Sequence, residues 1–137
     1  MAITILAFVS VGATLVWIVW MAHNSVPPQP GHNHLTGLPE STTQLNPHKV
    51  CMSTNAFMGD YPLMPVSDVT GTYYACSEHC KDALLSNEAE RYAIDPISKN
   101  RVNKAQAIIC VHPDKSGKVC YFESKENHLA FVKLQKL

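Results

Sequence analysis

Apolar residues fill the first part of the chain almost without interruption and then recur only in short blocks. Residues 2–22 read AITILAFVSVGATLVWIVWMA, in which two threonines and one serine are the only polar side chains. About 20 helical residues at roughly 1.5 Å each span a hydrocarbon core of ~30 Å. Trp17 and Trp20 fall at the end of the run, where amphipathic rings favour the headgroup region. The pattern predicts a transmembrane anchor at residues 1–22.

A cleaved signal peptide is the competing interpretation of this apolar run. The run is long, lacks a basic start and has no small-x-small pair before a cleavage point, all of which favour an uncleaved anchor. No Lys or Arg precedes Lys49, and no acidic residue precedes Glu40. An uncharged flank is compatible with translocation, so we expect a single-pass protein in the lipid bilayer, with its C-terminal domain on the periplasmic or extracytoplasmic side.

The next segment, residues 23–48, holds five of the nine prolines and no apolar periodicity. This composition predicts an extended, solvated linker. Four of the seven histidines lie in it: His23, His32, His34 and His48. The pair at 32 and 34 either binds a metal loosely or consists of ordinary polar linker residues.

Beyond the linker, short β-prone blocks alternate with capped helical segments. Gly71 precedes the β-prone residues 72–74, and Ser77 is a favourable N-cap for a helix of about residues 78–85. Further along, residues 107–111 and 118–122 flank the turn 113–117 as a hairpin. Ser124 then caps a helix of residues 125–134, for which the spacing predicts an apolar stripe of Leu129, Phe131, Val132 and Leu137.

These elements repeat at a shift of 47 residues, which predicts two tandem modules at 49–91 and 92–137. Tyr74 corresponds to Tyr121 and Ser77 to Ser124, and the residues around them shift in the same way. The predicted fold class is therefore α+β: an N-terminal transmembrane helix followed by two small tandem hairpin-plus-helix modules, which are treble-clef-like.

Chemistry is concentrated in three cysteines, Cys51, Cys76 and Cys80, which are spaced C-x24-C-x3-C. Residues four apart on a helix share a face, so Cys76 and Cys80 can bind one soft metal ion that Cys51 completes from a loop. The segment YYACSEHC resembles the YHS/TRASH family of small metal-binding modules, whose three cysteine positions these residues match. The resemblance implies a metal-handling fold.

The metal is open between copper and zinc. Zinc prefers a fourth ligand, for which His79, His48 and Asp60 are candidates, whereas Cu(I) is satisfied by three thiolates. Nearby thioethers favour copper weakly: Met52, Met58 and Met64. A structural zinc, or a disulfide within the three cysteines, is the alternative interpretation of the motif.

The second module lacks these ligands, because the shift of 47 places Ser98, Glu123 and Asn127 at the three cysteine positions. We therefore expect one soft-metal site per chain. The remaining cysteines, Cys110 and Cys120, lie opposite each other in the predicted hairpin and are within reach of a disulfide. Two reduced, packed cysteines are the alternative.

Composition excludes several functions. The 11 basic residues balance the 11 acidic ones, and no basic cluster marks a nucleic-acid interface. No nucleophile with an orienting base is recognisable, so we expect no enzyme. Three hypotheses remain: copper or zinc handling, with delivery to a metal-accepting protein; a small accessory subunit of a membrane protein complex; and a metal-responsive sensor.

Overall fold

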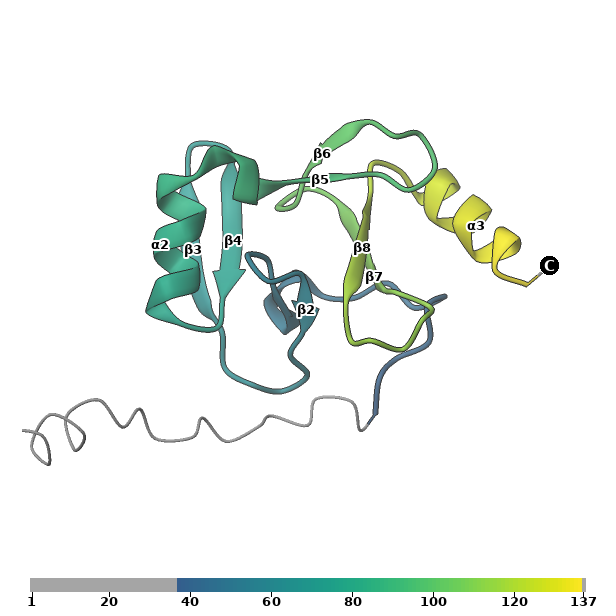
Figure 1. Ribbon diagram of the computed structural model, residues 1–137, viewed down its shortest axis with the longest axis horizontal. Coiled ribbons are helices and arrows are strands. Elements are labelled where there is room, and N and C mark those ends of the chain that lie inside the picture. Colours follow the sequence, from purple (N-terminus) through teal and green to yellow (C-terminus); the bar gives the residue numbers. More distant parts are fainter. Residues whose placement is uncertain (1–36, 137) are drawn as a thin grey trace, which may run out of the picture. The chain divides into compact units, whose positions relative to one another are not determined.

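The computed structural model describes residues 37–136, which fold around two α-helices and four two-stranded antiparallel sheets (Figure 1). The first half contains a 3-10 helix and then the elements β1 (Val50–Cys51), β2 (Ala56–Phe57), β3 (Met64–Asp68), β4 (Gly71–Ala75) and α2 (Glu78–Ser86). The second half begins with a 3-10 helix and contains β5 (Tyr92–Ile94), β6 (Arg101–Asn103), β7 (Ile108–Val111), β8 (Val119–Phe122) and α3 (Lys125–Leu134).

The internal repeat is visible in this order of elements. Each half has a short hairpin, a second hairpin and a helix, with pairing β1-β2 and β3-β4, then β5-β6 and β7-β8. The predicted hairpin-plus-helix unit is confirmed in both halves. The first hairpin of each half was not predicted, because strands of two or three residues carry no periodicity that a sequence pattern can detect.

Both helices start where their caps predict. The hydroxyl of Ser77 accepts a hydrogen bond from the backbone N–H of Cys80 at 3.2 Å, and that of Ser124 accepts one from Asn127 at 3.2 Å. A serine oxygen that satisfies a free N–H of the first turn fixes the point where a helix begins. The cap therefore determines where the third residue of each helix lies.

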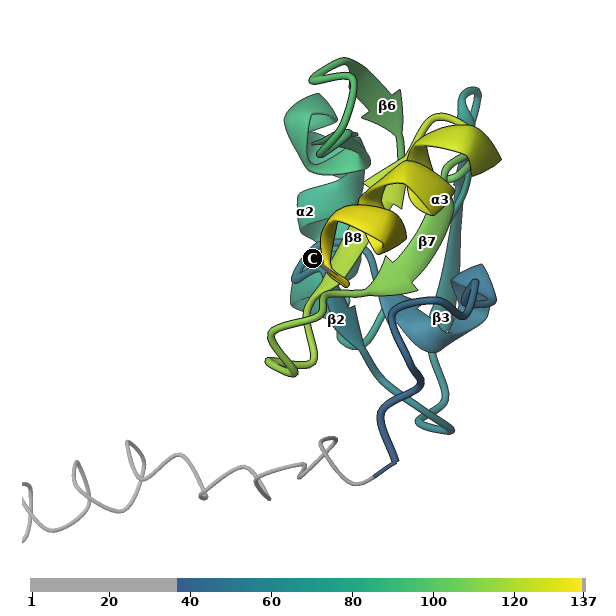
Figure 2. The same ribbon diagram turned by 90° about the vertical axis from the view of Figure 1, so that its right-hand side faces the viewer.

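The predicted apolar stripe of α3 is wrong in part: Phe131 is buried as predicted, but Leu129 is not, and Leu137 lies outside the described residues. Leu129 is 49% exposed, whereas His128 and Phe131 are the buried residues of the helix. Phe131 packs on Phe122 of β8, and His128 lies against the same ring with its Nε2 at 3.1 Å from the carbonyl oxygen of Ser41. The buried face is set by this aromatic contact with β8, over which α3 lies in Figure 2.

The hairpin β7-β8 has apolar residues on both faces and joins the two halves. Ile109, Val111, Val119 and Tyr121 belong to the core that also contains Val50, Cys51, Met52, Tyr73 and Leu84 of the first half. The other face of the hairpin, with Cys110, Cys120 and Phe122, packs with Phe131 of α3. A hairpin buried on both faces explains the continuous apolar runs 108–111 and 119–122.

Backbone contacts also cross between the halves. Phe57 donates its N–H to the carbonyl of Gly117 at 2.9 Å, and Val119 donates to Asn55 at 3.0 Å. At the β3-β4 turn, Gly71 has φ +147°, and a Cβ there would lie 2.6 Å from the Cβ of Ala105. The turn needs glycine because the second half approaches it so closely. The two described halves therefore form one compact unit.

Part of the predicted linker packs on this unit. Leu45 is buried, and its N–H donates to the carbonyl of Ile109 at 2.7 Å. Gln44 forms an isolated bridge with Cys110. Residues 37–48, which the sequence assigns to a solvated linker, are thus partly held against β7.

The structure does not support the predicted transmembrane helix. Within residues 37–136 no helix has the length and apolar character needed to cross a membrane. α2 has 9 residues and α3 has 10, about half of the ~20 that a span requires. The predicted anchor at residues 1–22 lies outside the described residues, as do His23, His32 and His34. The fold class supported is a small α+β protein, and the predicted single-pass membrane location is not supported.

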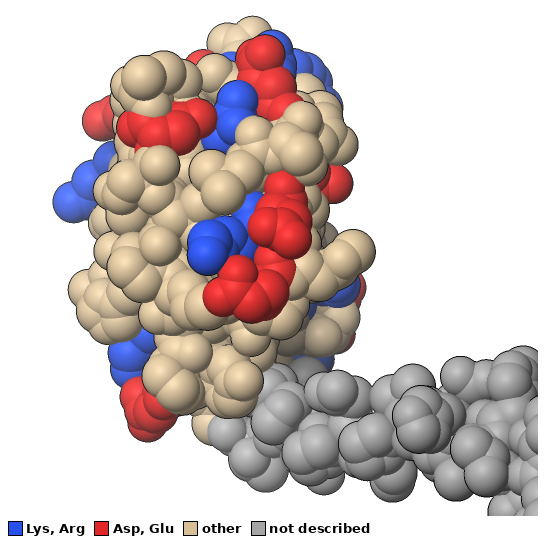
Figure 3. Space-filling model, turned by 90° about the vertical axis from the view of Figure 1, so that its left-hand side faces the viewer, with Lys and Arg blue, Asp and Glu red and all other residues tan. Residues whose placement is uncertain are grey.

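Charges on the side of the molecule that carries α2 and β3 are mixed in sign (Figure 3). Acidic and basic side chains are interspersed there, without a broad patch of one sign. On α2 itself, Lys81 pairs with Glu78 at 3.0 Å. Such a surface gives no strong single-sign field to steer a charged partner to this side.

Candidate metal centre

Three separate elements bring the three cysteines of the motif together. Cys51 ends β1, Cys76 directly follows β4, and Cys80 is the third residue of α2. The N–H of Met52 donates to the carbonyl of Tyr74 at 2.8 Å, which holds the end of β1 beside β4. The Ser77 cap then turns the chain into α2 and places Cys80 next to Cys76. The predicted convergence of these residues is confirmed.

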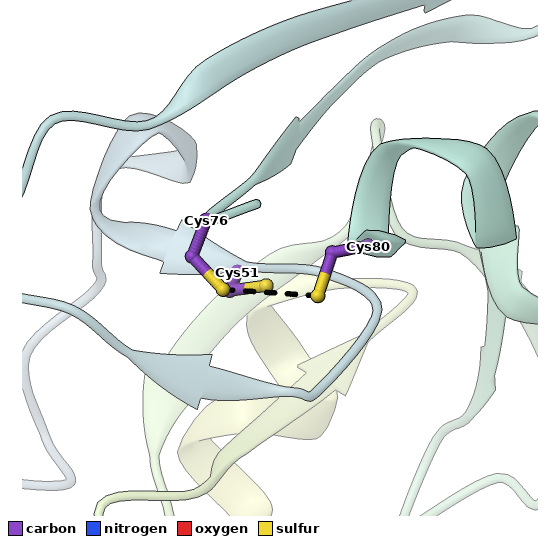
Figure 4. A group of neighbouring side chains, drawn as sticks. All are labelled: Cys51, Cys76 and Cys80. Atoms are coloured by element: carbon purple, nitrogen blue, oxygen red, sulfur yellow. Dashed lines mark hydrogen bonds between the residues drawn. The ribbon is translucent and has the colours of Figure 1, made fainter. Parts of the chain in front are cut away.

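The three sulfurs point toward one another (Figure 4) and lie within 4.8 Å of each other. The Sγ atoms of Cys76 and Cys80 are 3.7 Å apart. Sulfurs about 2.3 Å from a shared ion stand about 3.8 Å apart in tetrahedral and about 4.0 Å apart in trigonal geometry. Cys51 and Cys80 are buried, and Cys76 is half-buried. The cluster could hold one metal ion, with access on the side of Cys76.

The thiols differ in how readily they ionise. Burial opposes ionisation of Cys51, but hydrogen bonds from Thr54 and Cys76 outweigh it and lower the pKa of this thiol. Burial, together with the neighbouring Cys51 and Cys80, raises the pKa of Cys76 to about 12. Of these two thiols, Cys51 therefore ionises more readily, and Cys76 keeps its proton and donates to Cys51. A metal ion displaces that proton when it binds.

The predicted fourth ligands lie outside the cluster. Within residues 37–136 the three cysteines are the only group of three or more His, Cys, Asp or Glu side chains that converge in this way. His48 is exposed and meets the ring of Tyr74 edge-on at 6.4 Å. His79 is exposed on α2, because consecutive helical residues point about 100° apart. Asp60 pairs with Lys49 at 3.0 Å.

Sequence reasoning missed one residue beside the cluster, Lys104. It follows β6 and is only 3% exposed, and its Nζ donates to the carbonyl oxygen of Met52 at 2.7 Å. Burial lowers the pKa of Lys104 to about 8, while the charges of Glu90 and Cys51 act to raise it. The repeat offered a signal, because the shift of 47 residues places Lys104 at the position of Phe57, a buried apolar residue.

The second half has a hydrogen-bonded network in place of the sulfurs. Its centre is the buried carboxylate of Asp95, which accepts bonds from the backbone N–H groups of Ile97 at 2.7 Å and Ser98 at 3.2 Å. It also accepts bonds from the Glu123 N–H and the Asn127 side chain, both at 2.9 Å. Ser98, Glu123 and Asn127, which correspond to the three cysteines, therefore surround the Asp95 carboxylate. Residues of the second half donate all four of these hydrogen bonds.

The remaining two cysteines are direct partners in β7-β8, where Cys110 pairs with Cys120. This register is the one that the sequence predicted. Both are free and buried in the structure, where no disulfide joins them. Burial raises the pKa of Cys110 to about 12 and that of Cys120 to about 11, which makes both thiols poor nucleophiles while they are reduced.

Comparison with protein-family models, with curated proteins and with solved structures finds no match for this chain. The resemblance to YHS/TRASH modules therefore stays a prediction.

Proposed function

We propose that the chain binds one soft metal ion, Cu(I) in preference to Zn(II), through Cys51, Cys76 and Cys80, and that it serves in metal handling or delivery. The observation that carries the proposal is the convergence of three sulfurs within 4.8 Å from three different elements. Soft thiolate ligands select Cu(I) and zinc over hard cations.

The coordination number favours copper. No fourth His, Cys, Asp or Glu of residues 37–136 joins the sulfurs. Three thiolates satisfy Cu(I), whereas a structural zinc site is almost always four-coordinate. Two thioethers, of Met52 and Met58, lie in the same core cluster as Cys51 and Cys80. Zinc in this site would take water or a partner's side chain as its fourth ligand.

The partial exposure of Cys76 favours transfer of the metal ion over its permanent storage. Cys76 is half-buried, while the other two sulfurs are inside the core. A thiolate of a metal-accepting protein can reach an ion from the side of Cys76 and replace its bonds one at a time. Delivery by such stepwise exchange needs one open side of this kind.

The test is metal binding by reduced protein with Cu(I) or Zn(II), each measured against a competing chelator. We expect about one ion per chain, and a value near zero for Cys76→Ser. The matched control is Cys120→Ala, which removes a buried thiol outside the cluster and keeps the metal. Unchanged metal content in Cys76→Ser would contradict the proposal.

A structural metal in a small accessory subunit of a protein complex is the second candidate. The burial of Cys51 and Cys80 favours it, because an ion bound there joins β1 to α2. The two candidate functions predict different rates of metal exchange. A delivered ion moves to a chelating acceptor within minutes while the chain stays folded, whereas removal of a structural ion unfolds both described halves together.

A further inference from the structure

The ammonium group of Lys104 is buried beside the cysteine cluster and needs a compensating charge. An unpaired buried cation is strongly unfavourable, and buried charges are normally paired or bound to metals. In residues 37–136 no carboxylate forms an ion pair with Lys104, and its one hydrogen-bond acceptor is the carbonyl of Met52. That carbonyl belongs to the residue directly after Cys51.

Two side chains near this ammonium group, those of Tyr121 and Glu90, belong to the second half. The ring of Tyr121 lies 5.5 Å from the Lys104 Nζ, and the Tyr121 hydroxyl is buried without a hydrogen-bond partner among the described residues. Glu90, whose charge acts on Lys104 more strongly than that of Cys51, is half-buried on the 3-10 helix Glu88–Arg91 and forms no ion pair with this lysine. The cysteine cluster, which becomes negative when its thiols ionise, is thus the one buried source of negative charge near this lysine in the described part of the chain.

We infer that Lys104 is the counter-charge of the metal–thiolate centre and biases it toward the ion that leaves the more negative complex. Three thiolates with Cu(I) carry two net negative charges, and with Zn(II) they carry one. A fixed positive charge therefore stabilises the copper complex by one additional unit of charge interaction. This inference rests on the proposed function, because it concerns the selectivity of the same centre.

The same arrangement gives the second half a role. Lys104 and Tyr121 both belong to the second repeat, yet they border the site of the first. The repeat that has no cysteine ligands supplies the charge that adjusts the site of the other. Metal selectivity therefore depends on the contact between the halves.

The experiment compares the affinities of the reduced full chain for Cu(I) and for Zn(II), each measured alone with a competing chelator near neutral pH. Lys104→Gln removes the charge and keeps a hydrogen-bond donor, Lys104→Met removes both, and Lys104→Arg keeps the charge. The matched control is Lys118→Met: Lys118 also donates to a first-half carbonyl, that of Thr54 at 3.0 Å, but it is exposed.

We expect the ratio of Cu(I) to Zn(II) affinity to fall at least about tenfold in Lys104→Gln and Lys104→Met. Lys104→Arg restores most of the ratio, and Lys118→Met leaves it unchanged. A purely structural lysine weakens both ions equally, so an unchanged ratio in the uncharged variants would overturn the inference while leaving the proposed function intact. Failure of both uncharged variants to fold counts against it in the same way. Wild-type protein that binds neither ion overturns the proposed function, and the inference with it.

Discussion

Single residues were predicted well where their chemistry depends on local spacing. The approach of Cys76 to Cys80 follows from a strand-to-helix junction and one helical turn, which are local features, whereas Cys51 is brought to them by the contact of β1 with β4. His48 and His79 lie outside this group of cysteines, because their directions depend on packing against Tyr74 and on the helical phase. Lys104 could not be placed at all, since its burial results from contacts between residues 52 apart.

At this scale the carboxylate of Asp95 is the most testable residue outside the metal centre. Asp95→Ala removes the acceptor of four hydrogen bonds and leaves their donors unpaired, so we expect a loss of about 3 kcal/mol in the free energy of unfolding. Urea denaturation measures it. Asp114→Ala at an exposed turn is the control, with an expected loss below about 1 kcal/mol. A similar small loss in both variants would show that the network contributes little.

Asp95 also makes the free energy of unfolding depend on pH. Burial alone would raise the pKa of Asp95, but bonds from Asn127, Glu123, Ile97 and Ser98 outweigh burial and lower it. A carboxyl with a folded-state pKa below its unfolded value stabilises the fold above the unfolded pKa of about 3.9, and this stability is lost as the pH falls through the folded pKa. Metal-free wild type should therefore lose more stability between about pH 5 and pH 2 than Asp95→Asn does. Parallel curves for the two proteins would contradict this assignment.

At the scale of elements, both helices and the second hairpin of each half were predictable, because caps and turn residues mark them in the sequence. The buried face of α3 was not predictable. His128 and Phe131 are turned inward by Phe122 of β8, and helical spacing alone allows several faces for the same residues. The continuous apolar runs of β7 and β8 indicated strands, but only the structure shows that their two faces serve two different cores.

The repeated caps allow a matched experiment. Ser77→Ala and Ser124→Ala each remove a serine that caps the third residue of its helix, and each should destabilise the fold by about 1 kcal/mol. Only Ser77 positions a metal ligand, Cys80. We therefore expect Ser77→Ala to weaken Cu(I) binding about fivefold, the equivalent of about 1 kcal/mol, and Ser124→Ala to leave it unchanged. Equal effects of the two variants on affinity would mean that the cap does not order the site.

At the scale of the whole molecule, the repeat was found from the sequence, but it suggested two modules in tandem. The structure joins them through one core, to which Ile109 and Tyr121 contribute from the second half and Val50 and Tyr73 from the first. No sequence spacing encodes such a contact, because it depends on which faces of separate hairpins meet. The described halves should therefore fold as one cooperative unit.

The variant Ile109→Ala tests whether the two halves unfold together. Ile109 is fully buried in the shared core, so its truncation should cost about 2–4 kcal/mol. We expect amide hydrogen exchange to accelerate in α2 and β4 of the first half as well as in β7 and β8. The control Ile94→Ala changes a residue that is 59% exposed and should have little effect. Faster exchange confined to the second half would show that the halves unfold separately.

The proposed function requires that three sulfurs of this chain bind one soft ion. X-ray absorption spectroscopy of the Cu(I)-loaded, reduced full chain tests it most directly, because the method counts and identifies the atoms bound to the ion. The structure predicts three sulfur atoms at about 2.3 Å and no imidazole nitrogen. A histidine nitrogen in the first shell, or fewer than three sulfurs at full loading, would contradict it.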